Sequence, residues 1–208
     1  KMLYGENPDV IDRAGDVYTT AGTALLRGRG ESPENYCQPK WVFGACAGAA
    51  LYRVRMLNEI GLFDEDFFLL YEDVDLSFRA QLRGYKCLYV PDAVVYHQAS
   101  SSIGDDTSTA VYYSHRNLDW VYIQNMPARH FKRTIIPHLF YVLASFIFFA
   151  AKGRGGDYLR AKRDALKGLR RALHKRLKVQ NTKQVPDEYI WSLLEKERYL
   201  PRLIRRLG

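Results

Sequence analysis

The sequence predicts an α/β fold followed by a helical, basic C-terminal extension. Short apolar runs typical of strands alternate with helical periodicity up to residue 97, an order that favours an α/β layer. From Tyr112 onward the composition becomes helical and rich in Lys and Arg. At 208 residues, 47% of them hydrophobic, the chain is long enough for one sizeable domain or for a domain with an appendage.

The distribution of charge divides the chain near the same place. Residues 1–114 hold 10 Lys and Arg against 16 Asp and Glu, whereas residues 115–208 hold 21 against 7. Such asymmetry indicates that the two parts face different partners, so we expect two units, 1–114 and 115–208. The three cysteines are too few and too widely spaced for a disulfide scaffold or a zinc site, which favours reduced thiols in a cytoplasmic compartment. No signal-peptide pattern is visible at the first residues.

The first half of the acidic unit predicts loop and one buried strand. Residues 1–36 are rich in Gly, Asp, Asn and Pro, so we expect a surface loop with at most one short element and no chemistry. From Trp41 to Arg53 the residues are almost all small or apolar, which favours a buried strand and a turn where backbone approaches another backbone or a ligand.

The second half predicts alternating helices and strands. Residues 54–60 form a short helix candidate that ends at Gly61, and Asp64 and Asp66 are turn formers. Val74, Phe78 and Leu82 recur every four residues, so 73–83 is an amphipathic helix that ends at Gly84. Strands follow at 86–90 and 93–97.

The basic unit predicts a loop and two notable helices. The polar residues 100–109 are typical of a loop. Residues 134–151 are the most apolar stretch, but an 18-residue helix reaches only about 27 Å against a hydrocarbon core of ~30 Å, so we expect a core or interfacial helix. Residues 157–178 place leucines on one stripe among Lys and Arg, as in a helix on an anionic membrane, although a solvated helix packed on its own domain explains them equally well.

The sharpest cluster of chemistry is Glu72-Asp73-Val74-Asp75, where an aromatic run ends and a helix begins. Free N–H groups at a helix N-terminus hold a carboxylate ionised and in a fixed direction. Helix capping alone is the more common explanation of such a triplet. It leaves unexplained why three acids lie beside a small-residue run and an aromatic platform.

An Asp-x-Asp pair and a strand-end histidine are two further patterns that can bind metal ions. Asp73 and Asp75 spell Asp-x-Asp, but residues two apart on a helix point about 200° from each other and cannot share one ion. His97 ends a strand and enters a polar loop, a position that suits a ligand reaching into a cleft, although a strand-end histidine is more often structural.

The run from residue 48 to residue 97 resembles the second half of the family 2 glycosyltransferases, particularly the rhamnosyltransferase-like bacterial members. The resemblance rests on Gly48 to Arg53, Gly61 to Phe68, Tyr71 to Leu76 with Arg79, Gly84-Tyr85, Pro91-Asp92-Ala93 and His97. Tyr113, Arg116-Asn117 and the apolar and then basic tail are similar to the C-terminal extension of those enzymes, with looser motifs.

The resemblance implies a GT-A fold, of which this chain holds the acceptor-side half, with a nucleotide-binding half of roughly a hundred residues preceding it. It implies that Asp73 is the general base, that Glu72 helps to place a substrate and that His97 completes the coordination of Mg²⁺ or Mn²⁺. The remaining implied positions would bind the substrate: Gly48 and Ala49 line the sugar pocket, with Trp41, Phe68 and Tyr71 as stacking candidates.

The function expected on this basis is inverting sugar transfer from a nucleotide-diphospho-sugar to a lipid-linked or surface-polysaccharide acceptor of the bacterial cell envelope, on the inner face of the cell membrane. The chain alone is expected to be inactive, and an oligomer is compatible with the sequence. A non-catalytic membrane-binding module is the alternative. Nucleic-acid binding through the basic unit is a third reading, which the leucine stripe and the apolar segment disfavour.

Overall fold

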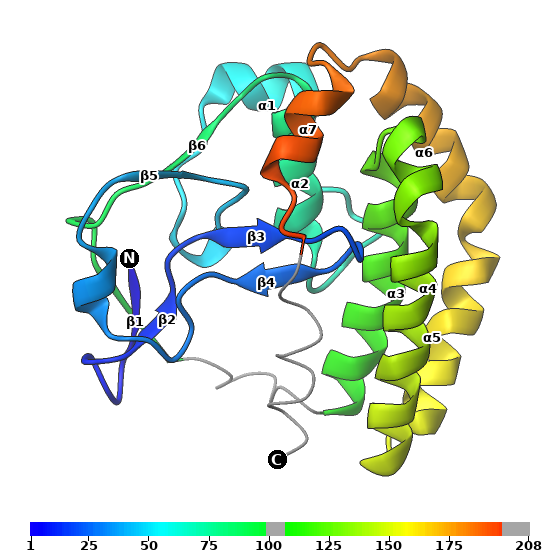
Figure 1. Ribbon diagram of the computed structural model, residues 1–208, viewed down its shortest axis with the longest axis horizontal. Coiled ribbons are helices and arrows are strands. Elements are labelled where there is room, and N and C mark those ends of the chain that lie inside the picture. The colour runs from blue at the N-terminus through cyan, green and yellow to red at the C-terminus, as the bar shows by residue number, and fades with distance from the viewer. Residues whose placement is uncertain (99–106, 197–208) are drawn as a thin grey trace.

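The computed structural model describes residues 1–98 and 107–196, and it is a mixed α/β structure with small sheets at one end and upright helices at the other (Figure 1). The strands are β1 (Met2–Tyr4), β2 (Ile11–Arg13), β3 (Asp16–Tyr18), β4 (Ala24–Leu26), β5 (Lys40–Val42), β6 (Cys87–Tyr89) and β7 (Val95–His97). The order of the three-stranded sheet is β2-β1-β7, in which β1 runs antiparallel to β2 and parallel to β7. Two antiparallel pairs, β3 with β4 and β5 with β6, accompany it.

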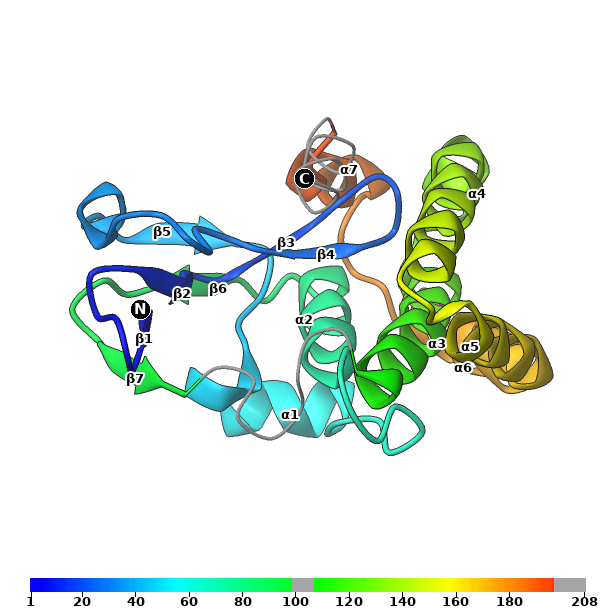
Figure 2. The ribbon, with the colours of Figure 1, turned by 90° about the horizontal axis from the view of Figure 1, so that it is seen from below.

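The helices form the other end of the molecule. They are α1 (Val54–Ile60), α2 (Glu72–Leu82), α3 (Ser108–Asn125), α4 (Ala128–Ala151), α5 (Gly155–Lys167), α6 (Leu169–Asn181) and α7 (Asp187–Leu193), with short 3₁₀ turns at Pro33–Tyr36 and Ala47–Ala49. Figure 2 shows α3 between α2 and the outer helices α4, α5 and α6, and α3 packs against α2, α5 and α6.

The main hydrophobic core joins the sheet end to the helical end. The rings of Tyr18, Phe43 and Phe78 meet with centroids 5.0 to 5.2 Å apart, so a strand, a loop and α2 share one aromatic cluster. The same cluster continues through Trp120 of α3 to Ile190 of α7. Side chains on both sides of residue 114 therefore fill one core, and the expected boundary between two units falls inside α3, so that division stays a prediction.

Several elements lie where the pattern of the sequence predicts them. Helix α1 ends before Gly61, whose φ of +84° only glycine adopts easily. Helix α2 buries Val74, Phe78 and Leu82 as their spacing predicts. Strands β6 and β7 lie within the two expected strand segments.

The first 36 residues contradict the expectation of a surface loop. They form β1 to β4, and Ile11 and Tyr18 are completely buried. Gly15 and Gly22 have φ of +98° and +76°, which permits the tight reversals between these short strands. Glycine in this segment thus marks turns between strands and not an unstructured surface.

The segment from Trp41 also differs from the expected buried strand. Among the described residues strand β5 pairs with β6 alone, and one face of such a pair is open to solvent. Trp41 is accordingly 60% exposed. The expected close approach of backbone holds at Gly44, where an added Cβ would lie 2.5 Å from Oγ of Ser77 on α2.

The expected loop at 100–109 lies mostly outside the described residues. Its last residues, Ser108 and Thr109, belong to α3, which Thr107 caps by accepting a 3.2 Å hydrogen bond from the Ala110 N–H. The expected single helix at 157–178 is two helices that meet at Gly168. A Cβ there would lie 2.4 Å from the Trp120 ring, so the chain bends where the indole occupies the space of a side chain.

Candidate functional site

A strained turn leads directly into helix α2. Phe68, Leu70 and Tyr71 have φ of +60°, +63° and +70°, a region that residues with side chains rarely adopt. Each such residue costs about 1–3 kcal/mol and persists only where the surrounding structure determines it, most often at functional sites. The turn therefore needs an external support.

Helix α3 supplies that support through two neighbouring residues. Nδ2 of Asn117, a fully buried residue, donates to the carbonyls of Phe67, Leu69 and Leu70 at 2.7 to 2.9 Å. Nη2 of Arg116 donates to the carbonyls of Asp66 and Phe67, both at 2.9 Å. Nε of Arg116 also donates to Oδ1 of Asn117 at 2.8 Å, which fixes the amide in the orientation that serves the turn.

The first turn of α2 directs its carboxylates apart. Asp73 accepts from the Ala47 N–H at 3.2 Å through Oδ2 and from the Val74 N–H at 2.8 Å through Oδ1. Asp75 is completely buried, accepts from Arg79 at 2.7 Å and accepts from Asn125 at 2.7 Å. The two acids do not share an ion site, as the helix geometry predicts.

Helix capping explains this triplet only in part: Asp73 accepts from the first-turn N–H of Val74, but none of the three acids is the N-cap residue. The N-cap residue is Tyr71, which has no oxygen that can accept from the first turn and makes no side-chain cap. Asp73 instead reaches the backbone of a segment 26 residues earlier in the chain. The Asp73 side chain therefore connects the start of α2 to the 3₁₀ turn Ala47–Ala49.

Strand β2 and strand β3 add two charged residues to the same place. Nη1 of Arg13 lies 3.5 Å from Asp16 and 3.7 Å from Oδ2 of Asp73. Burial, opposed by Arg13 and aided by the charge of Asp73, raises the pKa of Asp16 to about 7. Burial, aided by Asp73, also raises the pKa of Glu72.

Polar atoms without partners gather in this cluster. Among residues 1–98 and 107–196, the following buried side-chain atoms have no hydrogen-bond partner: Nε of Arg13, both carboxylate oxygens of Asp16, the hydroxyl of Tyr52 and Oε2 of Glu72. Buried polar atoms in folded proteins are nearly always satisfied, and an exception indicates stored strain, bound solvent or a functional group. Acids with raised pKa values and oxygens that accept no hydrogen bond, gathered in one place, mark a candidate site. We call Arg13, Asp16, Tyr52, Glu72 and Asp73 the carboxylate cluster.

The structure does not bring His97 to this cluster. Nδ1 of His97 lies 2.9 Å from Asp12, which in turn lies 3.7 Å from Arg29. Asp12 and Arg13 are neighbours on strand β2, and successive strand residues point to opposite faces. His97 and Asp73 thus contact opposite sides of one strand. Within residues 1–98 and 107–196, no three His, Cys, Asp or Glu side chains are grouped to hold a metal ion.

The other expected substrate-binding residues divide into two sets. Gly48 and Ala49 are exposed and belong to the segment whose Ala47 N–H binds Asp73, so they lie beside the carboxylate cluster. Phe68 is 76% exposed on the strained turn and its ring lies 5.4 Å from that of Tyr113.

Tyr71 and Trp41 point elsewhere. Tyr71 packs against the main core and its hydroxyl lies 3.4 Å from that of Thr23, an orientation toward the protein interior. Trp41 lies on the separate β5–β6 pair, where Lys86 sits 5.7 Å from its ring. In the described part of the chain neither side chain makes a hydrogen bond, ion pair or ring contact with the carboxylate cluster, although Trp41 lines a pocket of about 610 Å³ that Asp16 also lines.

Sequence reasoning missed Arg13, Asp16 and Tyr52 in this site and gave no role to Asn117. Arg13 and Asp16 lie in a segment whose Gly and Asp content indicated loop. The spacing of buried Ile11 and Tyr18 around them was a signal of strands, but three-residue strands are too short for alternation to stand out. Contacts such as that of Asn117 with residues about 50 positions away carry no local signature.

Comparison with known proteins matches the chain to one family model and to two curated relatives. The sequence model described as Glycosyl transferase family group 2 matches residues 34–152, more than half of the chain. Two relatives in Mycobacterium tuberculosis, from strains CDC 1551 and H37Rv, are each named N-acetylglucosaminyl-diphospho-decaprenol L-rhamnosyltransferase and are 35% identical over 77 residues. This alignment covers 37% of the chain but 24% of each relative, so the chain spans about a quarter of their length. No solved structure matches the chain significantly.

Replacement of Asn117 by Ala tests the support of the strained turn. The change leaves buried carbonyls without their donor, so we expect the free energy of unfolding to fall by about 2–4 kcal/mol in chemical denaturation. Asn58→Ala, on the exposed face of α1, is the matched control and should change it by less than about 0.5 kcal/mol. Equal small losses for both variants would show that the turn holds itself.

Asp16→Asn tests the raised pKa. Because burial raises the pKa of Asp16 from 3.8 to about 7, the folded state holds this proton more tightly than the unfolded chain. The resulting stabilisation is complete below pH 3.8, declines as the pH rises and is lost above about 7.

The unfolding free energy of the native protein relative to that of Asp16→Asn should therefore fall between pH 4 and pH 7 and then level off. Denaturation curves across that range measure it, with the exposed Asp9→Asn as control. A difference that stays flat or rises with pH contradicts a raised pKa.

Proposed function

The chain belongs to glycosyl transferase family group 2 and is rhamnosyltransferase-like, and on that premise we propose that it is the acceptor-side half of a GT-A glycosyltransferase with a helical extension. The reaction is transfer of a sugar such as rhamnose from a nucleotide-diphospho-sugar to a lipid-linked or surface-polysaccharide acceptor. We assign the activity to the full-length protein and expect this chain by itself to bind donor weakly and to catalyse no transfer.

The observation that carries the proposal is the position of Asp73 within the carboxylate cluster. Two backbone N–H groups orient its carboxylate, and the exposed segment Ala47–Ala49 lies against it, so the acid is just beneath the surface. A carboxylate has about four lone-pair sites, and two of them remain after these bonds. One can accept the proton of an incoming hydroxyl.

This geometry suits an inverting displacement. The acceptor oxygen forms a bond to the anomeric carbon as the bond to the nucleotide diphosphate breaks, and the acceptor proton passes to Asp73. The diphosphate leaves with the electron pair and needs no protein acid, so one carboxylate base is sufficient, unlike the pair that glycosidases use. Glu72, whose Oε2 accepts no hydrogen bond from the described residues, would help to position the acceptor or the donor.

A divalent cation has a limited place in this proposal. The described residues offer no group of three ligands, and the Asp12 contact of His97 supplies only one imidazole and one carboxylate. The residues present therefore do not build a metal site by themselves. If Mg²⁺ or Mn²⁺ takes part, His97 is the side chain we expect to contact it, and Asp73 acts without it.

The apolar face of α4 supports location at a membrane. The helix is 24 residues long, apolar enough to cross a membrane by composition, and only 28% of its apolar window is buried. Its exposed residues recur at helical spacing: Ile136, Leu139, Phe140, Leu143 and Ile147. The opposite face packs on the protein, where His138 bonds the Ala21 carbonyl at 2.9 Å and stacks on Tyr122.

A helix with one face on protein and one apolar face outward fits the membrane interface better than a span surrounded by lipid. Basic residues at both ends of α4, such as Arg129, Lys132 and Lys152, would meet anionic head groups. We propose a peripheral position on the cytoplasmic face of the cell membrane, near a lipid-linked acceptor. The same face also fits the alternative, a membrane-binding module without catalytic duty.

Asp73→Asn in the full-length protein separates these two functions. Asparagine keeps the shape and the contacts with N–H groups but cannot take up the acceptor proton, so sugar transfer should fall by at least about 100-fold. Binding to vesicles should stay unchanged. Exposed Asp92→Asn is the matched control and should transfer at the native rate; native transfer by Asp73→Asn would remove Asp73 from the mechanism.

The α4 face is tested without a change of charge. Leu139→Ser with Leu143→Ser removes two exposed leucines, each worth about 1.5–3 kcal/mol when buried in lipid, so we expect vesicle binding to weaken by at least about tenfold. The control is Leu51→Ser with Leu62→Ser, which are at least as exposed but lie away from α4. Equal losses in the two double variants would exclude α4 as the membrane contact. Vesicle co-sedimentation measures both.

A further inference from the structure

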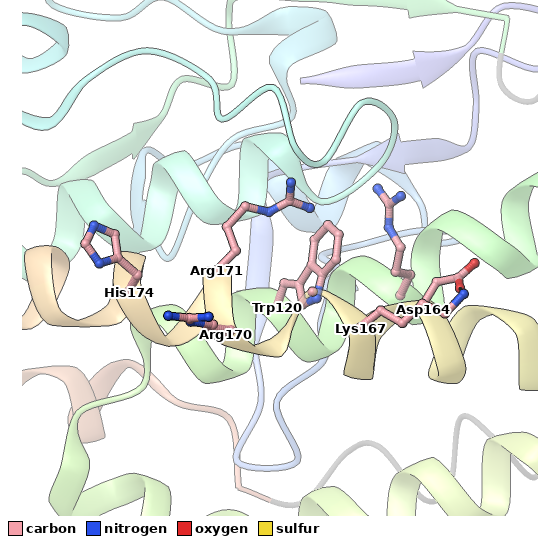
Figure 3. A pocket seen from close by; sticks show the side chains of 8 residues that line it. Trp120, Asp164, Lys167, Arg170, Arg171 and His174 are labelled. Atoms are coloured by element: carbon pink, nitrogen blue, oxygen red, sulfur yellow. The ribbon is translucent and has the colours of Figure 1, made fainter.

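A pocket of about 640 Å³ lies where α5 and α6 meet on the side of α3. Figure 3 shows Trp120 within it, with Lys167 and Asp164 of α5 on one side and Arg170, Arg171 and His174 of α6 on the other. The carboxylate cluster does not line it.

The floor of this pocket is rigid. Trp120 is 4% exposed and its Nε1–H donates to the Ala165 carbonyl at 3.1 Å. Gly168 leaves open the space that a side chain would take from the indole. The guanidinium groups of Arg116 and Arg171 lie 4.4 and 5.5 Å from the ring, so the aromatic floor positions two cations by their attraction to its face.

The pocket is lined by more positively than negatively charged side chains. Lys167 pairs with Asp164 at 3.1 Å, and hydrogen bonds from Arg163 and Lys167 lower the pKa of the Asp164 carboxyl to about 2. The negative charge of Asp164 is therefore already paired with these two cations. Arg171 pairs with Asp66 at 2.9 Å. Arg170 and His174 make no hydrogen bond or ion pair with the residues that the structure describes.

Positive charge gathered in a concave site concentrates anions, and the planar guanidinium fork matches the oxygens of a phosphate. A solvated basic helix face would need neither a fixed aromatic floor nor a bend. These features favour a built anion site over a solvated surface.

An apolar edge adjoins the pocket. Leu166 on α5 and Leu173 and Leu177 on α6 are 70%, 45% and 63% exposed, and Leu166 and Leu173 are the sequence neighbours of the pocket residues Lys167 and His174. On α6, Leu173 and Leu177 are four residues apart and Arg170 lies three residues before Leu173, so these three share one face of that helix. A ligand that fills the pocket and the edge together carries phosphate on a hydrocarbon chain.

We propose that this pocket binds the phosphate or diphosphate group of a lipid whose chain lies along the leucine edge. If the lipid is the sugar acceptor, the site would hold it by its diphosphate; that identity rests on the proposed function, whereas the binding itself does not. The same phosphate chemistry could come from a polyprenyl diphosphate or from a bilayer phospholipid.

The test compares binding by the full-length protein and by charge-matched variants. Arg170→Gln with Arg171→Gln removes two pocket charges, and Arg170→Gln alone spares the Asp66 pair. The control, Arg160→Gln with Lys178→Gln, removes two exposed charges from the same helices outside the pocket. The probes are inorganic pyrophosphate, a polyprenyl diphosphate in detergent micelles, and phosphatidylcholine vesicles with and without phosphatidylglycerol.

We expect the pocket double variant to bind polyprenyl diphosphate at least about tenfold more weakly, Arg170→Gln to give a smaller loss, and the control to change it less than twofold. Leu166→Ser with Leu173→Ser should weaken the polyprenyl diphosphate and leave pyrophosphate unchanged. A loss confined to phosphatidylglycerol vesicles, but specific to pocket variants, assigns the site to bilayer phospholipid.

Equal losses in pocket and control variants for every probe would overturn the proposal and leave a solvated basic face. If Leu166→Ser with Leu173→Ser leaves the binding of every lipid probe unchanged, the lipid chain does not lie along the leucine edge. Asp73→Asn should bind all probes normally, so loss of catalysis and loss of this site are separate outcomes.

Discussion

The contact on which the site depends is that between the Asn117 amide and the carbonyls of the turn before α2. Left-handed backbone at Phe68, Leu70 and Tyr71 is unfavourable for residues with side chains, and the internal hydrogen bonds of the turn involve the N–H groups of Phe67, Phe68 and Leu69 but not the carbonyls of Leu69 and Leu70 that Asn117 binds. The buried amide meets three of its carbonyls at once. Since α2 begins at the next residue, the direction of its first turn, and of the Asp73 carboxylate, follows from this contact.

Helix α3 carries that constraint into the rest of the molecule. Asn125, two turns beyond Asn117, donates to Asp75 and so fixes the far side of the same helix start. Trp120, between them, sets the bend at Gly168 and forms the floor of the basic pocket. The acidic and the basic parts of the sequence therefore share one scaffold, and a shift of α3 would move the carboxylate cluster and the pocket together.

The sequence predicted the local elements well because their signals are local. Helix α2 and the end of α1 follow from periodicity and from glycine, and the Glu72 to Asp75 segment stood out by composition. The partners of those residues could not be predicted, because Arg13 and Asn117 reach the site through contacts about 50 or more positions apart. His97 shows the opposite case: its strand was expected, but only the packing of β2 against β1 determines that it faces Asp12.

The electrostatics of the carboxylate cluster bear on the proposed reaction with a nucleotide-diphospho-sugar. The proposed base is a carboxylate, yet several negative charges in one place would repel a diphosphate. Burial raises the pKa of Asp16 to about 7, so the cluster holds less negative charge near neutral pH than its composition suggests, and burial also raises the pKa of Glu72. Arg13 lies between Asp16 and Asp73 and offsets part of the remainder. Asp73, whose oxygens accept from the N–H groups of Ala47 and Val74, is less buried than Asp16, and this is the reason for proposing Asp73 and not Asp16 as the base.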